Sequence, residues 1–221
     1  GITIINSVVD AMNLTINQTG GVNVSNTQAF TLTANSNNNN ITASTSSGNL
    51  SISSVNAGSG TVDLTASGGN ILDSTPSDDS AVNITAASIS LAGSTGVGAT
   101  GLGDIDTAAS TLELSTTSSG NIFVADSDAV TLASSSTSSN GNIDVRTVSG
   151  DLTVSSAVTA DGSGDIILNS AGALMVNNVL TSTSGDLSLT GATGVTHSAA
   201  GDLTTSGAGT ITVASTANDV T

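Results

Sequence analysis

Cysteine is absent from this 221-residue chain, so neither a disulfide nor a thiolate-bound metal can stabilise its fold. Trp and Tyr are also absent, and the aromatic content is only 1%. Lys and Arg together contribute one residue, Arg146, against 17 Asp and Glu, which gives a formal net charge of -16. Nucleic acids and anionic membranes both bind clustered basic side chains, so neither is expected as a partner.

Long apolar runs are missing as well. No stretch approaches the length of about 18 apolar residues that a membrane span needs, so no membrane insertion is expected. Residues 1–5 lack the basic start and the cleavage site of a signal peptide. Because the chain begins within a repeat pattern and without Met, we expect a segment or unit of a longer shaft or fibre.

Charged residues make up 8% of the chain, against about 25% in an average globular domain. Ser, Thr, Asn, Gly and Ala replace them, a bias that is typical of flexible linkers. However, 37% of the residues are hydrophobic, and the aliphatic ones fall at regular positions, which disordered linkers do not show. The chain is therefore expected to fold.

Two short phrases alternate at nearly constant spacing between residues 120 and 195. The first begins with Gly-Asn or Gly-Asp, and its first aliphatic residues stand at 122, 143, 166 and 187, which are 21, 23 and 21 residues apart. The second has its first aliphatic residues at 130, 152, 174 and 195, and follows the first by 8 or 9 residues. Such a period indicates a repeat array, so residues 1–221 are expected to form one continuous array.

Extending both phrases along the chain with an unbroken register predicts which residues stack on one another. A weaker third element follows them, visible at Val55, Val158 and Val179. The first series is Val22, Ile41, Val62, Val82, Ile105, Ile122, Ile143, Ile166, Leu187 and Ile211. The second series is Phe30, Leu50, Ile71, Ile89, Leu112, Val130, Leu152, Leu174 and Val195.

Each element alternates apolar and polar residues, as in Leu152-Thr153-Val154, which is the signature of a strand with one buried face. If each repeat is one coil, the strands stack in parallel and the inward aliphatic residues form a narrow core. The predicted fold is all-β, a parallel β-helix (β-solenoid) of about ten coils of roughly 21 residues with three short strands per coil. Loops at residues 35–40 and 93–101 and a turn at Pro76 are expected at its corners.

The acidic residues are the first candidates for chemistry, because catalytic β-helices such as pectate lyases and phage tailspikes use clustered carboxylates. The assumed register places Asp104, Asp165 and Asp186 in one corner column with Asn40, Asn121 and Asn142. The stacked carboxylates of Asp165 and Asp186 could bind calcium or share a proton. We prefer the alternative that they cap backbone N–H groups of the turns.

Asp104 and Asp106 follow a Gly-x-Gly phrase that is similar to the calcium-binding nonapeptide, although the nine-residue recurrence of that motif is missing. Calcium at Asp104, Asp106, Asp165 and Asp186 is the one metal that the sequence suggests, and no other cofactor is expected. Asp78-Asp79 and the pair Asp126 and Asp128 are interpreted as surface turns.

Catalysis is not expected. A saccharide-cleaving site would use aromatic platforms and basic groups, and this chain has no Trp or Tyr and a single Arg. Arg146 lies two residues from Asp144 on one strand face, which predicts a surface ion pair. His197 occupies an inward or corner position without a Ser, Cys or acid motif beside it, so a structural role is predicted.

Ice binding is a further hypothesis, because flat arrays of outward threonines bind ice. Leu72, Glu113 and Met175 interrupt the predicted outward column of the second strand, so ice binding ranks low. The full column is Thr31, Ser51, Leu72, Ser90, Glu113, Thr131, Thr153, Met175 and Thr196.

The two phrases, Gly-Asn/Asp-Ile/Leu-x-Val/Leu alternating with Ala-Val/Leu-Thr-Leu/Val, resemble the repeat shafts of filamentous haemagglutinin-like bacterial exoproteins and giant surface adhesins. The resemblance covers essentially the whole chain, but it is a repeat style without a site motif, so no functional residue follows from it. It implies a secreted, right-handed parallel β-helix, extracellular or on the bacterial surface, that extends from or coats a cell.

The main hypothesis is therefore a non-catalytic structural or adhesive rod with a host-cell, cell-surface or glycan ligand. The open strand edges at the two ends of a β-helix predict either end-to-end self-association or continuation of the same chain. A polysaccharide lyase or tailspike-like hydrolase is the first alternative, and an ice-binding solenoid is the second.

Overall fold

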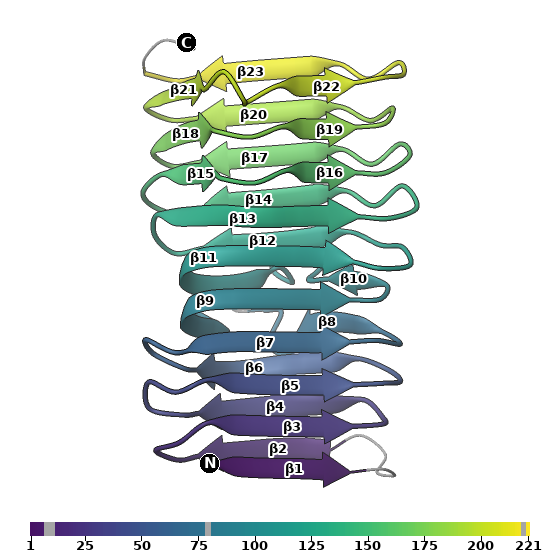
Figure 1. The fold of residues 1–221 in the computed structure, drawn as a ribbon, viewed down its shortest axis with the longest axis vertical. Coiled ribbons are helices and arrows are strands. Elements are labelled where there is room, and N and C mark those ends of the chain that lie inside the picture. The colour runs from purple at the N-terminus through teal and green to yellow at the C-terminus, as the bar shows by residue number, and fades with distance from the viewer. Residues whose placement is uncertain (7–11, 78–80, 218–219) are drawn as a thin grey trace.

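The computed structural model describes residues 1–6, 12–77, 81–217 and 220–221. Regular structure in these residues consists of 23 strands that pair in parallel as one sheet. The sheet is coiled into a shaft, and the two chain ends lie at opposite ends of its long axis (Figure 1). The predicted β-solenoid of about ten coils is confirmed.

Each coil has two opposed walls, which we call wall A and wall B, and their strands point in opposite directions across the shaft (Figure 1). The long strands β9 (Ile84–Gly93) and β11 (Ile105–Thr116) begin on wall B and continue onto wall A. Wall A consists of β1 (Ile2–Asn6), β3 (Val22–Asn26), β5 (Ile41–Thr45), β7 (Thr61–Ala66), the second halves of β9 (Ile84–Gly93) and β11 (Ile105–Thr116), β13 (Val130–Thr137), β15 (Leu152–Val154), β16 (Val158–Ala160), β18 (Ala173–Val176), β19 (Leu180–Ser182), β21 (Gly194–His197) and β22 (Leu203–Thr205). Wall B consists of β2 (Met12–Asn17), β4 (Phe30–Asn35), β6 (Leu50–Asn56), β8 (Asn70–Asp73), β10 (Gly96–Val97), β12 (Ile122–Asp126), β14 (Ile143–Thr147), β17 (Ile166–Ser170), β20 (Leu187–Gly191) and β23 (Ile211–Ser215), with the first halves of β9 and β11.

The core lies between the walls and follows from the alternation seen in the sequence. On β14, Ile143 and Val145 are fully buried, whereas Asp144 and Arg146 between and beyond them are partly exposed. Val145 pairs with Leu168 on the next coil, so inward aliphatic residues stack directly along the shaft. Burying one such side chain contributes about 1.5–3 kcal/mol, which is how short strands of three to six residues remain ordered.

The two walls exchange shape midway along the shaft. In the N-terminal coils wall A is straight, and wall B bends at an irregularity between Leu32 and Thr33 of β4. In the C-terminal coils wall B is straight, and wall A is divided into two short strands per coil, such as β15 and β16. The predicted three short strands per coil are therefore present in the C-terminal coils, whereas the N-terminal coils have two strands each, such as β3 and β4.

This exchange alters the stacking that the sequence predicts. Val62 pairs with Ile89 rather than with Val82, and Ile71 pairs with Val97. Val82 is 37% exposed and belongs to no strand. The prediction that Val82 and Ile105 continue the first series is wrong, because that series occupies wall A before this point and wall B after it.

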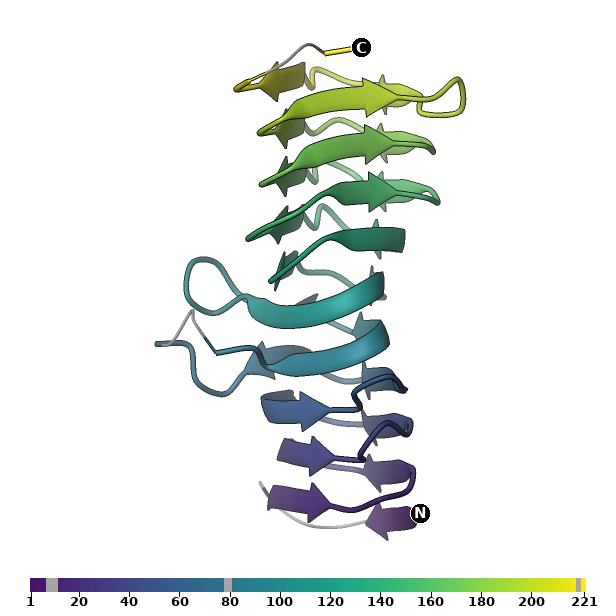
Figure 2. The same cartoon turned by 90° about the vertical axis from the view of Figure 1, so that its left-hand side faces the viewer.

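Two loops cause this change in the stacking register. One joins β8 to β9, and the other, residues 98–104, joins β10 to β11. Residues 98–104 and the described part of the first loop leave the shaft from the same side on adjacent coils (Figure 2). Partners that lie about one period apart elsewhere are separated by 27 residues from Val62 to Ile89 and by 25 from Val97 to Ile122. Pro76 lies in the first loop, and Asp78-Asp79 lie outside the described residues.

Glycine opens the repeated phrase because the backbones of adjacent coils approach closely there. A Cβ atom on Gly141 would overlap the carbonyl oxygen of Gly120, and Gly164 and Gly185 stand in the same relation to the coil below them. Gly120 also has a φ of 90°, which favours glycine. The glycine column is therefore a steric requirement of stacking.

Candidate functional site

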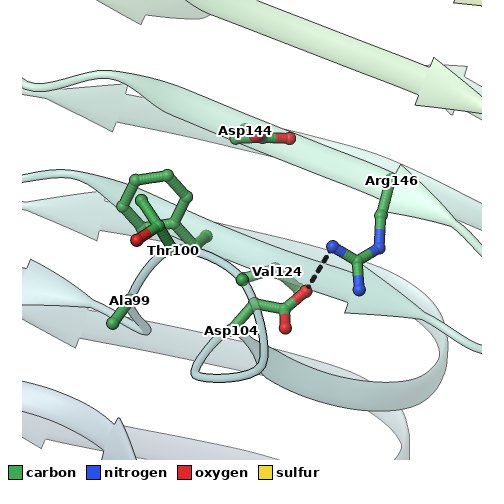
Figure 3. A pocket seen from close by; sticks show the side chains of 8 residues that line it. Ala99, Thr100, Asp104, Val124, Asp144 and Arg146 are labelled. Atoms are coloured by element: carbon green, nitrogen blue, oxygen red, sulfur yellow. Dashed lines mark ion pairs between the residues drawn. The ribbon is translucent and has the colours of Figure 1, made fainter. Parts of the chain in front are cut away.

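The candidate site lies on wall B, where the loop of residues 98–104 leaves the shaft and interrupts the repeat. Loop residues Ala99, Thr100 and Asp104 surround a small pocket together with outward residues of β12 and β14 (Figure 3). The pocket encloses about 70 Å³, more than the roughly 10–15 Å³ that a single buried water needs. Its lining residues are Ala99, Thr100, Gly101, Asp104, Phe123, Val124, Asp144 and Arg146.

An ion pair spans this pocket. The Nη1 atom of Arg146 lies 2.9 Å from Oδ2 of Asp104 (Figure 3), and the side chains are 36% and 3% exposed, respectively. Sequence analysis predicted instead a surface ion pair between Arg146 and its strand neighbour Asp144. That prediction is wrong because the loop brings a buried carboxylate to the guanidinium from another coil.

Asp144 also lines the pocket, and it is not the carboxylate that pairs with Arg146. Burial raises the pKa of Asp144, and the nearby Arg146 charge partly opposes this increase. Asp144 is half-buried and accepts no hydrogen bond from the described part of the chain. It is therefore an acceptor that a ligand hydroxyl or another donor could satisfy.

A second, open hollow lies beside the same loop and encloses about 360 Å³. Ala99, Thr100 and Phe123 line both this hollow and the pocket, so the two adjoin along the loop. The rest of the hollow is lined by one apolar side chain, two amides, one hydroxyl and the backbone of three glycines. These residues are Leu72, Asn70, Asn121, Thr95, Gly96, Gly98 and Gly120.

Asp106 lies two residues beyond the loop and is buried, with an exposed fraction of 7%. Its backbone N–H donates to Oδ1 of Asn83 at 2.9 Å, and Nδ2 of Asn83 donates to Oδ1 of Asp73 at the same distance. Asn83 therefore connects the bases of the two loops. Sequence reasoning missed it because its register within a long loop has no repeat counterpart.

Asp126 is fully buried, so its interpretation as a surface turn residue is wrong. Burial raises its pKa, despite hydrogen bonds donated by the Thr107 hydroxyl and by the backbone N–H groups of Asp128 and Ala109. The hydroxyl bond is 2.7 Å long. These bonds tie β12 to β11, so the buried carboxylate holds two coils together.

The predicted column of corner side chains is present on wall B from Asn121 upward. Oδ1 of Asn121, Asn142, Asp165 and Asp186 each accepts a backbone N–H from the next coil at 2.7–2.8 Å. The preferred interpretation, capping of turn N–H groups, is confirmed for Asp165 and Asp186. Hydrogen bonds from Thr210 lower the pKa of Asp186, which favours an ionised carboxylate over a shared proton.

Two residues assigned to that column lie elsewhere. Asn40 accepts the N–H of Thr61 beside wall A, and Asp104 lies in the loop. Nowhere among the described residues do three Asp, Glu or His side chains converge as a metal site requires. Calcium binding at Asp104, Asp106, Asp165 or Asp186 stays a prediction.

Two further candidates from the sequence are His197 and the outward column considered for ice binding. His197 is exposed, not inward, and its Nδ1 lies 3.1 Å from the Ser198 carbonyl oxygen. The outward column considered for ice binding is split, because Leu72 lies on wall B whereas Ser90 pairs with Glu113 on wall A. A continuous threonine array is therefore absent from that column.

None of the described residues forms a helix long and apolar enough to cross a membrane. No protein-family model matches the chain, and neither a curated protein nor a solved structure matches it.

Proposed function

We propose that this chain is a shaft segment of a non-catalytic structural or adhesive rod, extracellular or on a bacterial surface, of the filamentous haemagglutinin-like kind. The observation that carries this proposal is the unbroken core ladder. Inward residues of successive coils, such as Ile143, Ile166 and Leu187, stack in register and are each fully buried. A ladder of this kind makes a stiff, extensible element whose length grows with each coil.

Both end coils leave inward side chains uncovered, which supports end-to-end self-association of the rod. Ile211 is 44% exposed although its ladder partner Leu187 is fully buried, and Ile2 is 38% exposed although its partner Val22 is 3% exposed. These inward residues would be covered by one further coil. A second copy that docks end to end would supply such a coil.

The polar outer faces of the shaft support a role as a rod that is surrounded by solvent. They carry mainly Ser, Thr and Asn, and the formal net charge of -16 opposes non-specific association with nucleic acid or anionic lipid. The carboxylates of Asp165 and Asp186 accept backbone N–H groups. Their role in coil stacking favours a structural over a catalytic function.

Immunogold electron microscopy of thin-sectioned source cells, with antibody raised against this chain, tests the proposal. Label on surface filaments or in shed fibres is expected, with no label on cells that lack the gene. Label confined to the cytoplasm would contradict the extracellular assignment. Hydrolysis or elimination on a polysaccharide panel that is lost in the Asp165→Asn, Asp186→Asn double variant would contradict the non-catalytic assignment.

A further inference from the structure

We infer that wall B beside the loop of residues 98–104 binds a short, neutral saccharide, with a sugar ring against Phe123 and sugar hydroxyl groups on Asp144 and Thr100. Both hollows described above belong to this site. Such a site does not require the rod to be extracellular, so binding and cellular location are separate questions.

Phe123 provides a partly exposed aromatic surface for the sugar ring. The chain has two Phe, no Trp and no Tyr, and Phe30 is buried in the core at 2% exposure. Phe123 is therefore the one aromatic residue that reaches the surface, and it lines both hollows. A partly exposed ring beside Leu72 supplies the apolar platform on which the C–H face of a sugar can lie.

Hydrogen-bonding groups surround this platform. Asp144 accepts no hydrogen bond from the described residues, and the Thr100 hydroxyl is exposed and makes none with them. Oδ1 of Asn121 accepts the N–H of Asn142, so the NH₂ group of Asn121 is left to donate. A sugar hydroxyl both donates and accepts, and it matches this mixture of acceptor, hydroxyl and amide donor.

Charge selects the class of saccharide. Arg146 is neutralised by Asp104, and Asp144 adds a negative charge beside them. The whole chain carries a formal charge of -16. Sulfated, phosphorylated or carboxylated sugars are therefore repelled, whereas a neutral sugar avoids this penalty. The open hollow of about 360 Å³ lies at the small end of ligand sites, which range from about 300 to 1,000 Å³.

An array of neutral and acidic glycans probed with the folded chain tests this site, followed by calorimetric titration with the best neutral glycan. We expect binding to at least one neutral glycan. Phe123→Ala should weaken that binding at least tenfold, and Asp144→Asn at least fivefold. Ile167→Ala is the matched control, because Ile167 is a partly exposed residue of wall B that neighbours Asp144 in the ladder but lines neither hollow. The affinity of this variant should stay within twofold of the wild type.

Circular dichroism melts establish that each variant is folded. We expect all three variants to fold, because the substituted side chains face outward. Absence of any neutral glycan binder would overturn the inference, as would binding restricted to acidic glycans. Binding that Phe123→Ala leaves unchanged would also overturn it. None of these outcomes bears on the surface location of the rod, which the immunogold experiment decides separately.

Discussion

Arg146 on β14 forms an ion pair with Asp104, although the strand that follows Asp104 is separated from β14 by β12. Ile105 pairs with Val124, and Val124 pairs with Val145, so the ion pair crosses two steps of the ladder. The only cation among the Lys and Arg residues of this chain thus ties an outward loop to the shaft. The pair is the feature that distinguishes this coil from its regular neighbours.

Arg146→Met should destabilise the fold by about 2 kcal/mol, because it leaves the nearly buried Asp104 carboxylate without this compensating charge. Removing one partner of a fully buried pair costs about 3–5 kcal/mol, and the one-third exposure of Arg146 reduces the effect. Adding Asp104→Asn to Arg146→Met should recover most of the loss. Urea unfolding of both single variants and the double variant measures this coupling, and strictly additive effects would contradict the ion pair.

The change of register can be tested with engineered disulfides, because the chain has no cysteine of its own. Asp63 and Ser90 are partly or fully exposed ladder neighbours, so Asp63→Cys with Ser90→Cys should form a disulfide under mild oxidation. An unbroken 20-residue step would instead pair Asp63 with Asn83, so Asp63→Cys with Asn83→Cys is the matched control. Mass spectrometry after thiol alkylation distinguishes the two, and cross-linking of the control pair alone would contradict the observed stacking.

The fold could be predicted because its local rules are repeated in every coil. Alternation around Leu152 identifies a strand with one buried face, and Gly141 and Asn142 mark the turn that precedes β14. These signals are periodic, so each copy reinforces the others. The same regularity explains the wrong placement of Val82, because a strict period has no means of recognising two long loops in succession.

The candidate site was harder to predict for the same reason. Asp144 and Arg146 lie two residues apart on the same face of one strand, and that proximity suggested a local ion pair. Asp104 reaches Arg146 only because residues 98–104 leave the wall and return, which is a non-local consequence of loop length. The signal that could have drawn attention to the site is that Phe123, an outward aromatic, follows the Gly-rich insertion by one coil.

Asp165 should be replaceable by Asn at little cost in stability, since Asn142 caps the neighbouring coil with an amide oxygen in the same way. Asp165→Ala removes the acceptor for the N–H of Asp186 and should cost about 1 kcal/mol. Thermal melts of the two variants measure the difference. Calcium titration of the wild type and Asp165→Asn tests the calcium prediction in the same experiment, and a calcium-dependent stabilisation lost in Asp165→Asn would contradict a purely capping role.

Acidification from neutral pH towards the ordinary Asp pKa of 3.8 should first stabilise the fold. Burial raises the pKa of Asp126 and Asp144, so in this window the folded chain binds protons that the unfolded chain does not. The free energy of unfolding therefore rises as pH falls, and reducing the net charge acts in the same direction. The effect of Asp186 on stability has the opposite sign, because its pKa is lowered in the folded chain. Its contribution to the free energy of unfolding is lost as the pH falls below about 3.8.

Thermal melts between pH 7 and about pH 3 should accordingly pass through a maximum on the acid side of neutrality. Asp144→Asn removes one of these groups with a raised pKa, so the melting temperature of this variant should rise less steeply on acidification. A melting temperature that decreases steadily from pH 7 would show that these buried carboxylates do not dominate the pH dependence.

Electron microscopy of the purified chain, with and without a calcium chelator, shows whether the chain forms one continuous, extensible shaft. We expect straight rods of uniform width, each chain contributing roughly 45–50 Å of length, with a strand repeat of about 4.8 Å along the axis in both conditions. End-to-end fibres would identify a second copy as the coil that covers Ile2 and Ile211. Compact particles, or rods without the 4.8 Å axial repeat, would contradict the shaft.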